Sequence, residues 1–226
     1  MPTGRTVELT VLCEGSTERN FVTQVLHPHL VHHHVFAKPV GLDGKLTKSG
    51  GIVAHGTLCR NIKNEVGRLR GHQWVTTMID LYALPRDYPG WARQGLESGV
   101  DRALRIEKGM ADALPNQRFL PFVLVHEFEA LVLVDVDRIP DAFPDGEASA
   151  VPDLLRRSIG ALAPEQVNDG PTSAPSKRII AALPTYKALK AIAGPEISAK
   201  IGVAAIRAKC PHFNQWLTRL EGLATA

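Results

Sequence analysis

Four short apolar segments alternate with segments of helical periodicity along the first 135 residues. The first is Val7–Cys13, in which Val7, Leu9 and Val11 alternate on one face, and the others are 35–42, 73–81 and 118–125. A strand needs such period-2 alternation or a continuous apolar run, whereas a helix repeats its apolar residues every three or four positions. Strands separated by helices pair in parallel with helices on both faces. The sequence therefore predicts an α/β fold with a mostly parallel sheet.

The helical segments are expected after the first strand, through Leu30, then over 55–70 and 94–114. Beyond an acidic, proline-containing connection at 135–153, the periodicity is helical and is interrupted by proline and glycine. We therefore predict an α/β domain over 1–135 and a helical C-terminal region over 136–226 that packs on it. Pro39 in the second strand indicates a sheet edge or a bulge, and the glycine-rich 41–56 indicates a loop.

Composition limits the class of protein. The chain has 226 residues, 44% of them hydrophobic and 22% charged, which is typical of one globular core. Every apolar run is shorter than the about 18 to 20 residues of a membrane helix, and the N-terminus lacks the apolar core of a signal peptide. Three widely spaced cysteines, Cys13, Cys59 and Cys210, indicate reduced thiols in a cytoplasmic protein without a membrane partner.

Carboxylates follow three of the predicted strands. Glu14 follows the first, Asp80 ends the third, and Glu127 and Glu129 follow the fourth. Because the carboxyl ends of parallel strands meet at one edge, where α/β proteins bind ligands, these groups are expected to converge. Oxygen ligands of this kind suit Mg²⁺ or Mn²⁺, which can orient a phosphate and activate water. His126 could donate a proton or hold a phosphate.

Each carboxylate also has a structural interpretation. Glu14 can be a solvated turn residue and Asp80 a turn cap, while Glu127 and Glu129 can form the acidic first turn of a helix. Asp87, in a proline-containing loop, is a weaker candidate for the same edge.

The C-terminal segment 176–226 is basic, with eight Lys or Arg against two Glu, although the whole chain has a net charge of only +3. Such an excess fits a phosphate-bearing partner or a solvated helical surface. Lys177 and Arg178, after a proline-rich turn, could contact nucleic-acid phosphates or could begin an ordinary helix. His212 and Trp216 are expected to pack the helical tail onto the sheet.

Five histidines, at positions 27, 29, 32, 33 and 34, end the first helical segment. Helical spacing distributes their side chains around the axis, so a structural or surface role is favoured over metal binding, although such a cluster could bind metal adventitiously.

Several motifs resemble the uncharacterised bacterial family described as domain of unknown function 4276. They are Cys13-Glu14-Gly15-Ser16-Thr17-Glu18, Met78 to Pro85 with Pro89-Gly90, His126 to Leu131, Asn168 to Pro171, Ala174 to Arg178, Ile201-Gly202, Ile206-Arg207 and Cys210 to Phe213 with Trp216.

That resemblance implies a Toprim-like fold, which is the metal-binding domain of topoisomerases, primases and overcoming-lysogenization-defect nucleases. It also implies a place beside ATPases in phage-defence loci. Glu14 is similar to the glutamate after the first Toprim strand, and Asp80 to the first aspartate of the Asp-x-Asp pair. Tyr82 occupies the second aspartate position, a departure that leaves one carboxylate to be supplied by Glu127 or Glu129.

The leading hypothesis is a Mg²⁺- or Mn²⁺-dependent phosphoryl-transfer enzyme on DNA or RNA, most simply a nuclease. Glu14, Asp80, His126 and Glu127 are its candidate catalytic residues. Its candidate metal ligands are Glu14, Asp80, Glu127 and Glu129, and Lys177 and Arg178 are its phosphate contacts. The alternative is a regulatory subunit of an ATPase complex in which the acidic edge is only structural, and Tyr82 favours this alternative.

Overall fold

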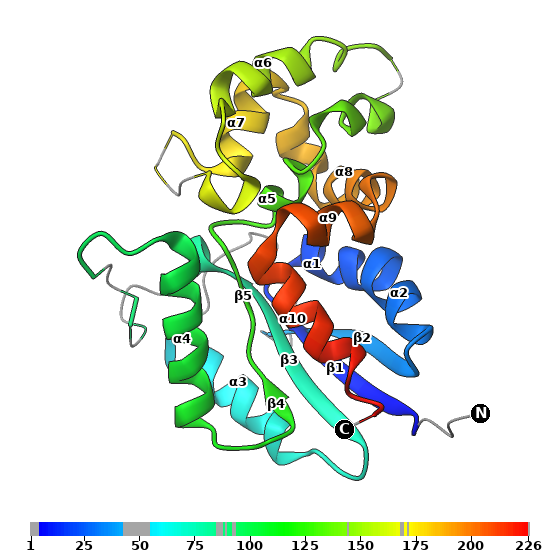
Figure 1. Ribbon diagram of the computed structural model, residues 1–226, viewed down its shortest axis with the longest axis vertical. Coiled ribbons are helices and arrows are strands. Elements are labelled where there is room, and N and C mark those ends of the chain that lie inside the picture. Colours follow the sequence, from blue (N-terminus) through cyan, green and yellow to red (C-terminus); the bar gives the residue numbers. More distant parts are fainter. Residues whose placement is uncertain are drawn as a thin grey trace.

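The structure is a computed structural model that describes residues 5–42, 55–84, 88, 90–91, 94–143, 145–167, 170 and 172–225. Most of the predicted 41–56 loop and Asp87 lie outside the described residues. A parallel sheet runs through the lower half of the molecule, and helices cover its two faces (Figure 1). The predicted α/β class is therefore confirmed.

The sheet has the strand order β2-β1-β3-β4, and β5 continues the pairing of β4 with β3. The long strands are β1 (Val7–Cys13), β2 (Val35–Gly41) and β3 (Gln73–Asp80). All pairings are parallel, with Val7 beside Val35 and Cys13 beside Met78. Pro39 lies in the edge strand β2 as expected, where its missing N–H interrupts no ladder on the outer side.

The predicted fourth strand over 118–125 is wrong as a single element. It is divided into β4 (Phe119–Leu120) and β5 (Val123–Leu124), each parallel to β3. Pro121 falls at the break and cannot donate to a ladder. The hydroxyl of Thr77 takes over there, because it accepts a hydrogen bond from the Phe122 N–H and donates one to the Phe122 carbonyl, both at 2.8 Å.

Two helices, α3 (His55–Gly67) and α4 (Gly99–Ala113), cover one face of the sheet. Leu58 and Ile62 of α3 and Ile106 of α4 form a core there with Val75 and Ile79 of β3. The expected start of the second of these helices at residue 94 is also wrong. Ser98 caps it, because its Oγ accepts a hydrogen bond of 3.1 Å from the Asp101 N–H.

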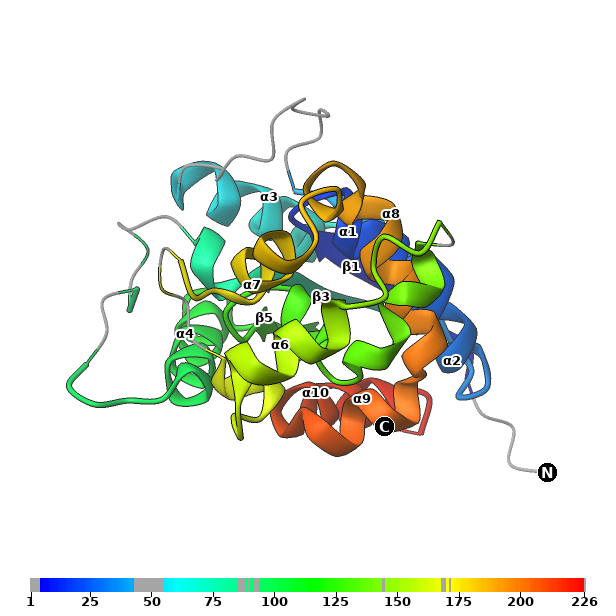
Figure 2. The ribbon, with the colours of Figure 1, turned by 90° about the horizontal axis from the view of Figure 1, so that it is seen from above.

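The other face is covered by the helical segment after β1 and by the end of the chain (Figure 2). The first segment consists of α1 (Ser16–Phe21), a π-helical turn at Val22–Leu26 and α2 (His27–Val31). The π-helical turn ends two residues before Pro28, which has no N–H to donate to a helical hydrogen bond.

The C-terminal region is helical, as predicted. After the short α5 (Glu129–Val132) come α6 (Val151–Ile159), α7 (Pro175–Ala182), α8 (Tyr186–Ile201), α9 (Val203–Lys209) and α10 (Pro211–Glu221). One hydrophobic cluster contains Phe21 of α1, Ile197 of α8 and Leu217 of α10, so the helical region shares its core with the sheet.

Helix α10 is fixed to the sheet by polar as well as apolar contacts. The Trp216 indole stacks on Phe122 with ring centroids 4.1 Å apart, and its Nε1 donates a 2.9 Å hydrogen bond to Thr76 Oγ1. The buried His212 imidazole lies 2.9 Å from Glu107 Oε1 of α4. The predicted packing role of His212 and Trp216 is confirmed.

Helix α8 approaches α1 closely because Gly194 has no side chain. A Cβ at this position would lie 3.5 Å from the Thr17 methyl group of α1, and 3.1 Å from both the Phe128 ring and the Tyr186 hydroxyl. This close packing places the first turns of α8 above the carboxyl ends of the strands (Figure 2). Within the described residues, no helix is both long and apolar enough to cross a bilayer.

Candidate functional site

The carboxyl end of β1 carries two carboxylates one helical turn apart. Glu14 follows the strand directly and is half-buried, and Glu18 lies buried in the first turn of α1. Gly15 between them adopts an extended conformation, and its N–H donates a 2.8 Å hydrogen bond to Glu18 Oε2. The turn therefore directs both side chains to the same edge of the sheet.

Asp80 ends the neighbouring strand β3 and connects two parts of this edge. Its N–H donates a 3.3 Å hydrogen bond to Glu14 Oε2. Its own Oδ1 accepts a hydrogen bond of 2.9 Å from the N–H of Phe128. The predicted convergence of Glu14 and Asp80 is therefore present, and Asp80 also positions the chain that carries Glu127 and Glu129.

Glu127 and Glu129 have different partners. Glu127 Oε2 accepts a 2.8 Å hydrogen bond from the N–H of Ser176, in the first turn of α7. Glu129 is completely buried, and its Oε1 lies 3.4 Å from the Tyr186 hydroxyl and 3.5 Å from Lys190 Nζ. Among the described residues, Glu129 Oε2 is a buried oxygen without a hydrogen-bond partner.

The electrostatics of this group show an excess of negative charge. Burial and then repulsion by Glu18 raise the pKa of Glu14 to about 8, against the lowering effect of the Asp80 N–H. Burial and the neighbouring carboxylates raise the pKa of Asp80 well above its usual value. The pKa of Glu18 and that of Glu129 are also raised, mainly by burial. We call Glu14, Glu18, Asp80, Glu127 and Glu129 the acidic edge.

Lys190 of α8 brings a positive charge to the acidic edge. Burial opposes its positive charge, but Glu129, Asp80, Glu127 and Glu18 outweigh that effect and raise the pKa of Lys190. Its side chain is 44% exposed, so the ammonium group is reachable from solvent.

Sequence reasoning missed Glu18, Tyr186 and Lys190. Glu18 had a usable signal, since a spacing of four from Glu14 across a helix start places both on one side. Tyr186 and Lys190 had none, because their position depends on the packing of α8 against α1 and α5.

His126 and Asp87 are the remaining candidates for this edge, and Tyr82 occupies the position of the missing carboxylate. The His126 imidazole packs over Gly99 at the start of α4, and His126 has a positive φ of 66°. Tyr82 follows Asp80 in a 3₁₀ turn, Leu81–Ala83, and is 43% exposed. It supplies no carboxylate at that position. Asp87 lies outside the described residues.

Lys177 and Arg178 differ from each other. Lys177 is exposed on α7. Arg178 holds α7 to the end of α6, because its Nε donates a 2.7 Å hydrogen bond to the Ser173 carbonyl and its Nη1 bonds Ser158. Of the two predicted phosphate contacts, Lys177 is thus the one with an exposed side chain, whereas Arg178 stabilises the packing of α7.

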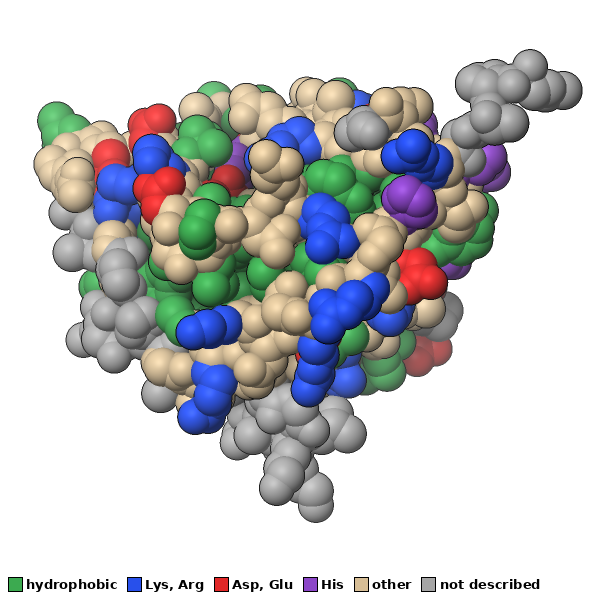
Figure 3. Space-filling model, turned by 90° about the horizontal axis from the view of Figure 1, so that it is seen from below, with side chains coloured by type: hydrophobic (Ala, Val, Ile, Leu, Met, Phe, Trp, Pro, Cys, Tyr) green, Lys and Arg blue, Asp and Glu red, His purple; other side chains and the backbone are tan. Residues whose placement is uncertain are grey.

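Several other cations of the basic segment also have structural partners. Lys200 pairs with Glu196, Arg207 pairs with Glu221, and Lys209 donates a 2.8 Å hydrogen bond to the Val134 carbonyl. On the face at the amino ends of the strands, Lys and Arg side chains are scattered among hydrophobic and other residues (Figure 3). The basic excess of the sequence is therefore partly used inside the fold.

The fit of a metal to the acidic edge depends on how far its oxygens are apart. In the described part of the chain, the one set of three potential ligand atoms lying within 4.8 Å of one another belongs to His29, His33 and Glu221, away from the acidic edge. The acidic edge is thus too open for three direct ligands as it stands. The potential ligands of the acidic edge are nevertheless all oxygen atoms, and a cation would relieve the repulsion that contributes to the raised pKa of Glu14 and of Asp80. A hydrated Mg²⁺ or Mn²⁺, which keeps several waters, suits such a site.

Comparisons with known proteins give the family and no activity. No curated protein and no solved structure matches the chain. A family model described as domain of unknown function (DUF4276) matches residues 13–221, which include the whole acidic edge, Lys177, Arg178 and Lys190. The chain therefore belongs to the DUF4276 family.

Proposed function

We propose that this protein is a divalent-metal-dependent phosphoryl-transfer enzyme acting on DNA or RNA in the cytoplasm, most simply a nuclease. The observation that carries the proposal is the convergence of the acidic edge from the ends of β1, β3 and β5 beside a partly exposed lysine. A hydrophobic core alone does not account for five carboxylates in one place, because repulsion by neighbouring carboxylates helps to raise the pKa of Glu14 and of Asp80 and so costs stability.

Glu14, Asp80, Glu127 and Glu129 are the proposed metal ligands. A bound Mg²⁺ or Mn²⁺ would supply charge neutralisation for a phosphate and a more acidic water. The hydrogen bonds from Asp80 N–H and Ser176 N–H orient Glu14 and Glu127, so these two carboxylates are held in place before any ligand arrives.

Lys190 can hold a phosphate oxygen, because its ammonium group is half-exposed and already lies at the acidic edge. Lys177 is the proposed contact to a neighbouring phosphate, and Arg178 supports α7, whose first turn binds Glu127. His126 is retained as a candidate proton donor.

The direct test is a cleavage assay with single- and double-stranded DNA and RNA, in Mg²⁺ or Mn²⁺, with and without an ATPase encoded beside the protein. Glu14→Gln removes a negative charge but keeps the size, and cleavage should fall below detection while thermal stability is kept or rises. Glu8→Gln is the matched control, because exposed Glu8 lies at the other end of β1 and bonds only the Gln73 side chain among described side chains. A stable Glu14→Gln protein that cleaves like the parent would contradict the proposal.

A second candidate is a non-catalytic subunit of an ATPase-containing complex, with a role in phage defence under either candidate. Tyr82 in place of a carboxylate and the built-in cation Lys190 favour it. Copurification with the ATPase, together with absence of cleavage under every metal condition above, would establish this candidate instead.

A further inference from the structure

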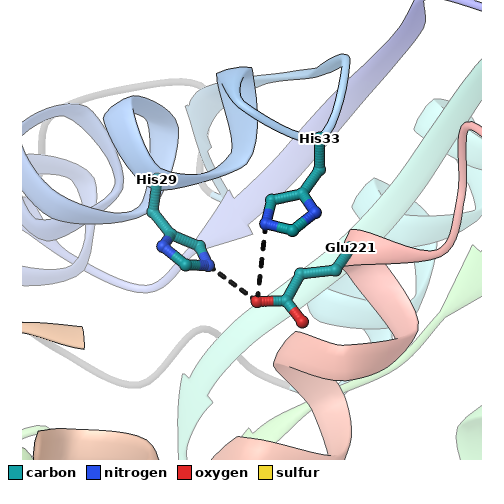
Figure 4. Close-up of side chains that lie close together, drawn as sticks. All are labelled: His29, His33 and Glu221. Atoms are coloured by element: carbon teal, nitrogen blue, oxygen red, sulfur yellow. Dashed lines mark hydrogen bonds and ion pairs between the residues drawn. The ribbon is translucent and has the colours of Figure 1, made fainter. Parts of the chain in front are cut away.

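His29 and His33 come together at the end of α2, although helical spacing distributes the other histidines of this segment. They are one helical turn apart, and their ring centroids are 5.3 Å apart. Glu221, the last residue of α10, lies opposite them (Figure 4). The Nε2 atoms of both imidazoles point toward the same carboxylate oxygen, Oε1, at 2.7 Å for His29 and 3.8 Å for His33.

We propose that His29, His33 and Glu221 form a binding site for a Zn²⁺-like transition-metal ion that links α2 to α10. The three ligand atoms lie within 4.8 Å of one another. Zinc bound at about 2.0–2.1 Å in tetrahedral geometry holds its ligand atoms about 3.3 Å apart, and the two observed separations lie on either side of that value. Two imidazoles and one carboxylate leave a fourth position for water.

The surroundings of Glu221 prepare it as a ligand. Arg207 Nη1 donates a 2.9 Å hydrogen bond to Oε1, and the guanidinium is itself held by Asn214 at 2.7 Å and Thr218 at 3.0 Å. Arg207 therefore fixes the orientation of the carboxylate by a hydrogen bond to the same oxygen that the imidazoles face, and such hydrogen bonds are common at ligating carboxylates.

The two imidazoles select the kind of ion. The positive charge of Arg207 repels any divalent cation, and Mg²⁺, which prefers oxygen ligands, gains nothing from the imidazoles that would offset this repulsion. Imidazole nitrogens suit Zn²⁺, Co²⁺, Ni²⁺ and Cu²⁺. The site is thus chemically distinct from the acidic edge, and the inference does not rest on the proposed function.

An ion here would join two segments that are far apart in the sequence. Helix α10 covers the sheet through Trp216, and α2 leads into the edge strand β2. Because the ion would bind only where both helices are docked, it should stabilise the folded chain in proportion to ln(1 + [L]/Kd).

The test uses the full chain without an affinity tag and titrates it with Zn²⁺, following heat by calorimetry and thermal stability in parallel. His33→Gln is the main variant, since this side chain is 39% exposed and tolerates replacement. His32→Gln is its matched control, because exposed His32 lies next to it and is not among the three ligands. Glu14→Gln is the second control, against zinc bound at the acidic edge.

We expect one equivalent of Zn²⁺ to bind at this site in the parent, in His32→Gln and in Glu14→Gln, separately from any zinc at the acidic edge, and to raise the melting temperature of each. His33→Gln should bind at least tenfold more weakly and lose the rise in melting temperature. Co²⁺ in place of Zn²⁺ should give the visible absorption of a four-coordinate site in the parent, and this absorption should be absent in His33→Gln. Equal binding by the parent and His33→Gln, or equal weakening by His32→Gln, would overturn the proposal.

Discussion

Lys190 Nζ of α8 lies 3.5 Å from Glu129 Oε1 of α5, so a half-exposed lysine side chain brings a positive charge to a completely buried carboxylate. Removing one partner of a buried pair leaves the other charge uncompensated, and this is costly. The stability of the metal-free protein should therefore depend on this ion pair.

Lys190→Gln should lower the free energy of unfolding by about 1–2 kcal/mol in metal-free buffer, which is less than for a fully buried pair because solvent reaches the lysine. Added Mg²⁺ should stabilise this variant more than the parent, since the competing cation is gone. Urea denaturation with and without Mg²⁺ measures both effects. Lys187→Gln, on the exposed side of the same helix, is the control. Equal stability of the two variants would show that Lys190 does not balance the carboxylates.

The contribution of the acidic edge to the stability of the metal-free protein should decrease as the pH rises from about 5 to 9. The ordinary pKa of a glutamate is 4.5 and that of Glu14 is raised to about 8, so the folded chain holds a proton that the unfolded chain has released between these values. Asp80 and Glu129 are shifted in the same direction. Urea denaturation in a chelating buffer across this pH range tests the sign, and Glu14→Gln should flatten the dependence.

Mg²⁺ affinity should rise over the same pH range, because binding to a carboxylate requires that its proton be released. Calorimetry in two buffers of different ionisation enthalpy counts the protons. For the pH dependence of stability, a free energy of unfolding that increases between pH 6 and 8 in the parent relative to Glu14→Gln would contradict a raised pKa of Glu14.

Lys177→Ala should weaken nucleic-acid binding without changing the melting temperature. If its ammonium group contacts one phosphate, the slope of log affinity against log salt should decrease by about 1. Arg178→Ala should instead lower stability by about 1–2 kcal/mol, because the hydrogen bonds to Ser173 and Ser158 are lost. A salt titration of parent and variants separates the two roles. An unchanged slope in Lys177→Ala would place the phosphate contacts elsewhere.

Trp216→Ala should cost about 3–5 kcal/mol, since it removes a large side chain from the contact between α10 and the sheet. Trp216→Phe keeps the stacking on Phe122 but loses the hydrogen bond to Thr76, and should cost about 1–2 kcal/mol. Arg219→Ala, exposed on the same helix, should be nearly neutral. Near-parental urea denaturation of Trp216→Ala would mean that α10 does not contribute to the cooperative core.

Much of the fold follows from local patterns. Leu9 and Val11 alternate in β1, Leu58 and Ile62 repeat in α3, and these patterns are local consequences of which faces are buried. The convergence of Glu14 and Asp80 was predictable for the same reason, because neighbouring parallel strands must end at one edge.

Features that depend on long-range packing were not predictable from these patterns. The apolar run at 118–125 does not reveal that Thr77 replaces the missing strand contact beside Pro121. Similarly, the contact of Lys190 with Glu129 depends on the packing of α8 against α5, where Gly194 leaves room for the Phe128 ring. His29 and His33 face Glu221 only once α10 is docked, which the helical spacing of the histidines alone does not show.

Anomalous diffraction from crystals soaked in Mn²⁺ tests most directly whether the acidic edge binds a divalent metal. We expect an anomalous peak for a Mn²⁺ ion that is bound by a carboxylate oxygen of Glu14 or Asp80 and by water molecules, and we expect this peak to be lost in Glu14→Gln crystals. Absence of a peak at the acidic edge, at Mn²⁺ concentrations that support any activity, would contradict metal binding by these carboxylates.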